Sequence, residues 1–162
     1  SEVPLEQIDS ILLDYHSRTS NALVQLLSKH FWKIQPKFKK SDVDFESNIQ
    51  SNTAGVIIGD RAYNYRDSFP FVYDLSEEWK KFSGLPFVFA CWVSNKPLDS
   101  SFKKAFSSAL EYGISNLDLA FSEKSDAFDT QIDKMKYLKE VINYDLTDEK
   151  RKSMQIFLNL IS

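Results

Sequence analysis

The stretch Asp14-Tyr15-His16-Ser17-Arg18-Thr19-Ser20 follows an apolar run, Ile8 to Leu13, and precedes Asn21 to Trp32, whose apolar residues recur at helical spacing. This pattern predicts a short buried strand that ends in a hydroxyl-rich turn and opens a helix. The first amides of a helix lack intrahelical partners and lie at the positive end of its dipole, so they attract a carboxylate or a phosphate. The stretch therefore favours an anion site at this strand–helix junction.

Five residues of this turn are candidates for substrate binding: His16, Ser17, Arg18, Thr19 and Ser20. The alternative is purely structural, because Ser17, Thr19 and Ser20 are all good helix-capping residues and Arg18 can simply be solvated. His16 has two open interpretations, a hydrogen bond that supports the site or a direct contact with the ligand. The turn by itself does not separate these alternatives.

A second strand candidate is the apolar run Ala54 to Ile58, which ends in Gly59-Asp60. Gly-Asp is a turn signal, and it places a carboxylate at the C-terminal edge of the strand. Ligands of open α/β sheets bind at this edge. We therefore expect the two turns to form one pocket, with Asp60 as the catalytic candidate and Gly59 as a binding candidate. The alternative is that Asp60 is an exposed turn residue.

The rest of the chain divides into an α/β part and a helical part. Ile34 to Phe38 predicts an edge strand, because Pro36 removes a ladder donor. Leu75 to Phe82 predicts an amphipathic helix that Gly84 ends. The continuous apolar run Leu85 to Val93 predicts a strand covered on both faces.

Only helical patterns follow Asp99. The predicted helices are Phe102 to Gly113, Leu117 to Phe121, Gln131 to Asn143 and a last one that begins at Thr147. The predicted fold class is therefore α/β. We expect one complete α/β lobe over residues 1–87, then a hinge strand and the helical C-terminal part of a second lobe over residues 88–162.

The composition narrows the classes of function. A hydrophobic content of 43% allows a sizeable core, and a net charge of -3 argues against a nucleic-acid partner. The longest apolar run, Leu85 to Val93, is about half the length needed to span a bilayer, which argues against a membrane protein. The single cysteine, Cys91, lies inside this run, so a buried thiol is expected. The absence of a disulfide framework and of a secretory signal is compatible with a cytoplasmic location.

Several familiar chemistries lack their motifs. His16, His30 and the one cysteine have no zinc-ligand spacing, so no metal site is predicted. The four glycines form neither a phosphate-binding loop nor a dinucleotide fingerprint, and no Gly-x-Ser-x-Gly elbow occurs.

Four ordered motifs give the chain a family resemblance. They are Asp14 to Ser20, Ile58 to Ala62, Tyr73 to Trp79 followed by Gly84 to Trp92, and Tyr144 to Phe157. With these motifs the chain resembles, over essentially its whole length, the chorismate dehydratase family of the futalosine route to menaquinone. The resemblance implies a two-lobed fold similar to that of type 2 periplasmic binding proteins, with the ligand in the cleft between the lobes.

The resemblance also implies an activity, the removal of water from chorismate to give 3-[(1-carboxyvinyl)oxy]benzoate. This hydro-lyase reaction needs no cofactor, because aromatisation drives the elimination. Ser17, Thr19, Ser20 and the helix amides would bind one carboxylate of this dicarboxylate, and Arg18 would add charge. Asp60 would border the pocket and position or polarise the ring hydroxyl. No residue is assigned as the general base.

One departure from the family concerns the start of the chain. Family members carry a further N-terminal stretch that contributes to the cleft, whereas this sequence starts near the first hinge crossing. We therefore expect a partial chain that is inactive alone and is completed by an N-terminal segment or by a homo-oligomer. The alternative functions are a non-catalytic protein of the same fold that binds a small anion, and a related later enzyme of the futalosine route.

Overall fold

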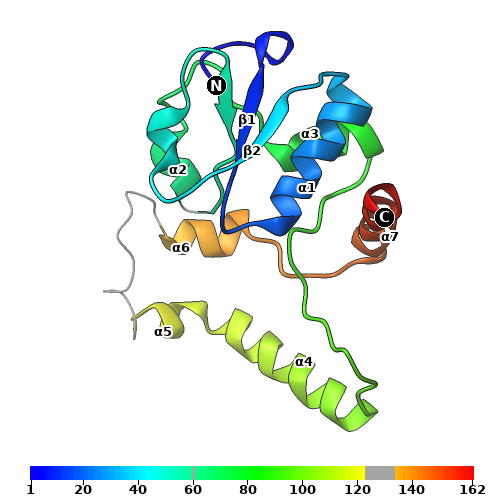
Figure 1. Ribbon diagram of the computed structural model, residues 1–162. Helices are drawn as coiled ribbons and strands as arrows, with labels where there is room; N and C mark the ends of the chain where they lie inside the picture. The colour runs from blue at the N-terminus through cyan, green and yellow to red at the C-terminus, as the bar shows by residue number, and fades with distance from the viewer. Residues whose placement is uncertain (60, 123–133) are drawn as a thin grey trace. The chain divides into compact units, whose positions relative to one another are not determined.

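The computed structural model describes residues 1–59, 61–122 and 134–162, which form two compact units (Figure 1). The first unit comprises Ser1–Ala90 and Leu146–Ser162, and the second comprises Cys91–Asp145. The last helix of the chain therefore packs in the first unit.

A three-stranded parallel sheet lies at the centre of the first unit. The strands are β1 (Ser10–Leu13), β2 (Lys37–Lys40) and β3 (Thr53–Gly55), in the order β2-β1-β3. In the register of the sheet, Ile11 lies between Phe38 of β2 and Ala54 of β3. The predicted α/β class is therefore confirmed. The edge strand predicted over Ile34 to Phe38 begins only at Lys37, and the strand predicted over Ala54 to Ile58 is limited to Thr53–Gly55.

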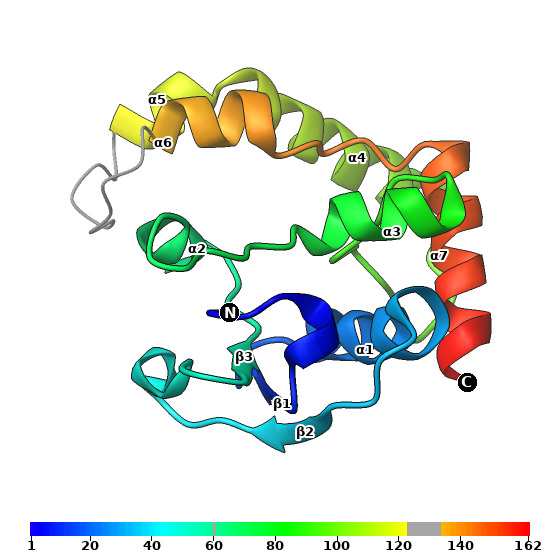
Figure 2. The same ribbon diagram turned by 90° about the horizontal axis from the view of Figure 1, so that it is seen from above.

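Helix α1 (Arg18–Leu27) connects the sheet to the other helices of this unit. Val24 packs with Ile11 and Ala54 of the sheet, whereas Leu23 and Leu27 pack with Trp79 and Phe157. Figure 2 shows α1 between the sheet and α3 (Leu75–Ser83). The apolar residues of α1 thus contribute to two clusters, one with the sheet and one with α3 and the last helix of the chain, and this burial accounts for their helical spacing in the sequence.

The second cluster lies where α1 meets α3 and α7 (Asp148–Ile161). Trp79 of α3 is completely buried there, against Phe157 of α7. The indole N–H of Trp79 donates a hydrogen bond to Oγ of the buried Ser153, at 2.8 Å. The predicted end of α3 is confirmed, since Gly84 has a φ of 74° and closes the helix in the left-handed region.

Short helical segments connect these elements. They are the 3₁₀ turns η1 (Leu5–Gln7) and η3 (Phe45–Asn48), the π-helical turn η2 (Ser28–Trp32) that extends α1, and the short helix α2 (Arg61–Tyr65).

Gly55 is the position where β3 approaches its neighbours most closely. A Cβ atom at Gly55 would lie 2.7 Å from Cγ1 of Ile49 and 3.2 Å from the ring of Phe45. We expect Gly55→Ala to lower the free energy of unfolding by about 1–3 kcal/mol, because the buried Ile49 must move to make room. Urea denaturation measures this change.

The control for this substitution is Gly113→Ala, since a Cβ at helical Gly113 meets no atom within 4 Å. That variant should be neutral or up to about 1 kcal/mol more stable, because alanine favours a helix over glycine. Combining Gly55→Ala with Ile49→Val should recover part of the loss. If Gly55→Ala alone proves neutral, the close packing of β3 on Ile49 is contradicted.

The prediction of a strand over Leu85 to Val93 is wrong for this structure, which assigns no strand to these residues. The run leaves the first unit as extended chain, and its side chains are exposed from Phe89 to Val93. Cys91 is also exposed, so the expected buried thiol is wrong as well. A continuous apolar run indicates a preference for burial, but a strand forms only where a neighbouring backbone pairs with it.

The second unit is helical, as predicted. It contains α4 (Ser100–Ser115), α5 (Leu117–Ser122), α6 (Lys134–Lys136) and the π-helical turn η5 (Tyr137–Val141). Part of the predicted helix Gln131 to Asn143 lies outside the described residues. None of the residues of α4 is buried, and Phe102 and Phe106 stack on each other with Phe102 exposed.

Candidate functional site

The structure resolves which residue caps α1. Ser17 is the N-cap, with extended backbone, and its Oγ accepts a hydrogen bond from the Ser20 N–H at 3.0 Å. Helix geometry leaves the N–H groups of Arg18 and Thr19 without an intrahelical acceptor. Arg18 is exposed, Thr19 is half-buried and Ser20 is buried. The capping interpretation is therefore confirmed for Ser17, and the start of α1 has the geometry that an anion site requires.

Asp14 holds the turn between β1 and α1. Its carboxylate is fully buried, and Oδ1 accepts a hydrogen bond from the His16 N–H at 2.8 Å. Its carbonyl oxygen accepts hydrogen bonds from the Ser17 N–H, at 3.4 Å, and from Nδ2 of Asn21, at 2.7 Å. The ring of His16 is exposed and lies 4.1 Å from that of Tyr15, centroid to centroid. His16 therefore contributes its backbone to the turn.

Asn21 lies one turn into α1 and was not singled out in the sequence. Because Nδ2 donates to a carbonyl, the orientation of the amide group is determined. Its Oδ1 is buried and accepts no hydrogen bond from the residues that the structure describes.

The second predicted turn follows β3 at the same edge of the sheet. β3 pairs with β1 in parallel, and Val56 N–H extends the pairing by donating to the Leu12 carbonyl at 2.9 Å. Gly59 is exposed with a φ of 66°, a left-handed conformation that favours glycine, and its carbonyl accepts from the Ala62 N–H. The predicted catalytic residue Asp60 lies outside the described residues.

Arg61 brings the two turns together. Nη2 of Arg61 lies 2.5 Å from Oδ2 of Asp14, and Nη1 lies 2.9 Å from Oε1 of Glu46. The guanidinium carbon lies 5.2 Å from the centroid of the Tyr15 ring. The turn after β1 and the turn after β3 therefore meet, as the shared sheet edge predicts. The contacts of Arg61 and Glu46 were not predicted, because neither residue shows a pattern in the sequence that pairs it with Asp14.

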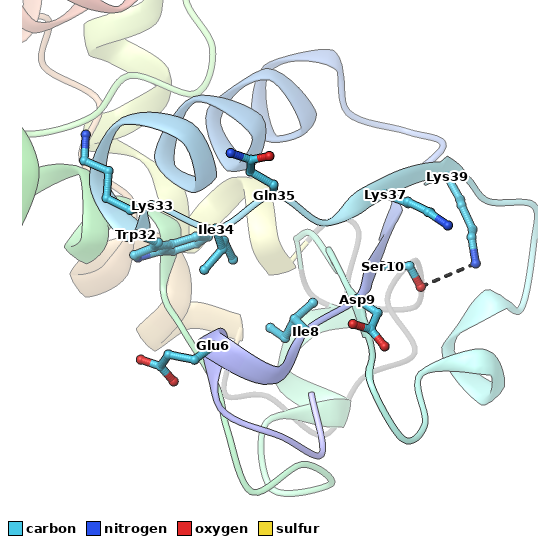
Figure 3. A pocket seen from close by; sticks show the side chains of 10 residues that line it. All are labelled: Glu6, Ile8, Asp9, Ser10, Trp32, Lys33, Ile34, Gln35, Lys37 and Lys39. Carbon is cyan, nitrogen blue, oxygen red and sulfur yellow. Dashed lines mark hydrogen bonds between the residues drawn. The ribbon is translucent and has the colours of Figure 1, made fainter.

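A cleft of about 670 Å³ lies elsewhere, at the N-terminal ends of β1 and β2 (Figure 3). Figure 3 shows Lys33 beside Trp32 at one end of the cleft, and Lys37 and Lys39 near Ser10 at the other. Acidic residues share the lining, so its charges are mixed. The residues that line it are Glu6, Ile8, Asp9, Ser10, Trp32, Lys33, Ile34, Gln35, Lys37 and Lys39.

None of the predicted site residues that the structure describes lines this cleft. Ligands of parallel sheets bind at the carboxyl ends of the strands, and the cleft lies at the opposite ends. We therefore take the turns after β1 and β3 as the candidate site, since helix amides, hydroxyls and a guanidinium converge there.

Within residues 1–59, 61–122 and 134–162, no group of three or more His, Cys, Asp and Glu side chains could hold a metal ion. No helix among these residues combines the length and apolar character needed to cross a membrane.

Comparison with protein families assigns the chain to a metabolic pathway. A family model described as menaquinone biosynthesis matches residues 1–162, which is the entire sequence. This match agrees with the resemblance to the chorismate dehydratase family that the sequence motifs indicate. The chain therefore belongs to the menaquinone biosynthesis family.

Proposed function

We propose that this protein is a chorismate dehydratase, which removes water from chorismate to give 3-[(1-carboxyvinyl)oxy]benzoate. The observation that supports this function is the start of α1, where Ser17 caps the helix and the N–H groups of Arg18 and Thr19 lack intrahelical acceptors. A dicarboxylate substrate suits this helix start, and the family places the protein in menaquinone biosynthesis.

In the proposed complex, one carboxylate of chorismate accepts hydrogen bonds from the first amides of α1. The side chains of Thr19 and Ser20 add hydroxyl donors, and Arg18 adds a positive charge. The ring hydroxyl leaves with a proton from the ring as one molecule of water, and the ring becomes aromatic. Asp60 borders the pocket and positions or polarises this hydroxyl.

The proposal includes the finer fold as well. We propose that the first unit, with its parallel sheet and covering helices, is one lobe of a two-lobed fold similar to that of type 2 periplasmic binding proteins. A crystal structure of the full-length protein with chorismate tests this. Density for the substrate away from the start of α1 would contradict the proposed site.

Removal of the anion-binding side chains tests the function directly. We expect the double variant Arg18→Ala/Ser20→Ala of the full-length protein to lose about 100-fold or more in kcat/KM for chorismate. The reason is that a sheltered charge-assisted hydrogen bond contributes about 1.5–3 kcal/mol. The measurement is the loss of the diene absorbance of chorismate with time.

The matched control is Lys29→Ala, which removes an exposed basic residue from η2, beyond the opposite end of α1. This variant should retain the wild-type kcat/KM. Equal activity of the double variant and the control would refute carboxylate binding at the start of α1. Binding of chorismate to the wild-type protein without loss of absorbance would instead favour a non-catalytic anion-binding protein.

A further inference from the structure

We propose that Arg61 is the positioning residue of the substrate-binding turn. The guanidinium holds the turn in place through its ion pair with Asp14. It also pairs with Glu46, so both carboxylates beside the proposed anion site contact a positive charge. This inference rests on the proposed function for its kinetic consequences, but its structural consequence can be measured independently.

The first argument is the burial of the negative charges. The side chain of Asp14 is 0% exposed and that of Glu46 is 6% exposed, whereas that of Arg61 is 28% exposed. Carboxylates that are removed from water need a positive partner, because an uncompensated buried charge is strongly destabilising. Arg61 contacts both carboxylates at hydrogen-bond distance, and its planar fork is suited to such a bridge.

The second argument is connectivity. Arg61 is the first residue of α2, which follows β3, whereas Asp14 follows β1 and Glu46 belongs to η3. A single side chain therefore ties three segments that are distant in the sequence. The carboxylate of Asp14, which Arg61 contacts, also accepts a hydrogen bond from the His16 N–H, and the backbone carbonyl of Asp14 accepts one from the Ser17 N–H. The conformation of the turn thus depends on Arg61 through one intermediate residue.

The third argument is the sign of the field at the start of α1. Asp14 and Glu46 without Arg61 would place two negative charges beside a site for a carboxylate, and like charges in a sheltered environment repel strongly. With Arg61 in place both carboxylates contact a positive charge, and the dipole of α1 favours the ligand. Arg61 therefore acts on the substrate through the other groups, without a contact to the reacting atoms.

The test uses Arg61→Gln, Arg61→Lys and the double variant Asp14→Asn/Arg61→Gln in the full-length protein. We expect Arg61→Gln to raise KM for chorismate by about tenfold or more, with kcat within about threefold of wild type. This pattern indicates that the substrate and the transition state are bound more weakly by the same amount. Arg61→Lys should fall between wild type and Arg61→Gln, because an ammonium keeps the charge but not the fork. The double variant should restore KM part of the way to wild type, because it removes the Asp14 charge but leaves that of Glu46.

A second measurement does not depend on the substrate. Hydrogen–deuterium exchange of peptides that contain His16, Ser17 and Ser20 should become faster in Arg61→Gln and return towards wild type in the double variant. The control is Lys81→Gln, which breaks the ion pair between Lys81 and Glu78 on α3, at 2.6 Å and away from the turn. This control should change neither KM nor exchange in the turn.

The outcomes separate the two proposals. If wild-type protein does not consume chorismate, the proposed function fails, and exchange in the turn still decides the role of Arg61. Unchanged exchange in Arg61→Gln overturns the positioning role. A KM that the double variant does not rescue also overturns it, because Arg61 would then bind the substrate itself. A loss confined to kcat overturns it too, because Arg61 would then act on the reacting atoms.

Discussion

Trp79→Ala lowers the free energy of unfolding by about 3–5 kcal/mol, the range for removing a large aromatic side chain from a core. Trp79 is 0% exposed, and its ring makes edge contacts with Phe82, Phe87 and Phe157 at centroid distances of 5.5–5.9 Å. Alanine would leave a cavity where α1, α3 and α7 meet. The measurement is urea denaturation followed by circular dichroism, since the substitution removes a fluorophore.

Trp79→Phe is the matched control, because it keeps an aromatic ring and removes the indole N–H. The Oγ of Ser153 is then buried without its donor, so this variant should lose about 1–3 kcal/mol. Ser153→Ala combined with Trp79→Phe should cost less than the sum of the single changes, because the two side chains share one hydrogen bond. A loss below about 1 kcal/mol for Trp79→Ala would contradict the central place of this residue.

Asp14→Ala is expected to have the second largest effect on stability, a loss of about 2–4 kcal/mol, because it removes one partner of a buried ion pair. The variant removes the Asp14 oxygens that contact Arg61 and the His16 N–H, while Arg61 keeps its ion pair with Glu46. Part of the loss is offset because Arg61 is partly exposed and water can reach it. The turn should also loosen at the start of α1, which hydrogen–deuterium exchange detects.

Asp9→Ala is the matched control for this prediction. Asp9 precedes the same strand, β1, but its side chain is exposed, so the substitution should change stability by no more than about 0.5 kcal/mol. Asp14→Asn should fall between the two, because asparagine keeps an acceptor for the His16 N–H and loses the charge. Similar stabilities of Asp14→Ala and Asp9→Ala would show that the Asp14 cluster does not hold the fold together.

Local patterns were sufficient for several elements of the first unit. Capping residues, glycine after a helix and apolar periodicity act within a few residues. The helices α1 and α3 and the start of α7 could therefore be predicted from adjacent residues in the sequence. The parallel pairing of β1 and β3 then put the turns after them at one edge. This is why the meeting of the two turns was predictable without a structure.

The contacts that join distant segments were not predictable in this way. Arg61, Glu46 and Asp14 are ordinary charged residues in the sequence, and only the fold brings their side chains within hydrogen-bond distance. The run Leu85 to Val93 also shows that the sequence does not determine long-range contacts, because here an expected contact is missing from the described structure. Its apolar character indicated burial, but the described structure provides no neighbouring strand, so Trp92 and Val93 remain exposed.

The sequence by itself determined the α/β class, the family and the strand–turn–helix junction from Asp14 to Ser20, because these depend on residues that are adjacent or regularly spaced. Only the tertiary structure decided that Ser17 caps α1, that the carboxylate of Asp14 is buried and that Arg61 forms an ion pair with this carboxylate. The physical reason is that burial and ion pairing depend on which segments pack together, and that packing involves residues far apart in the chain.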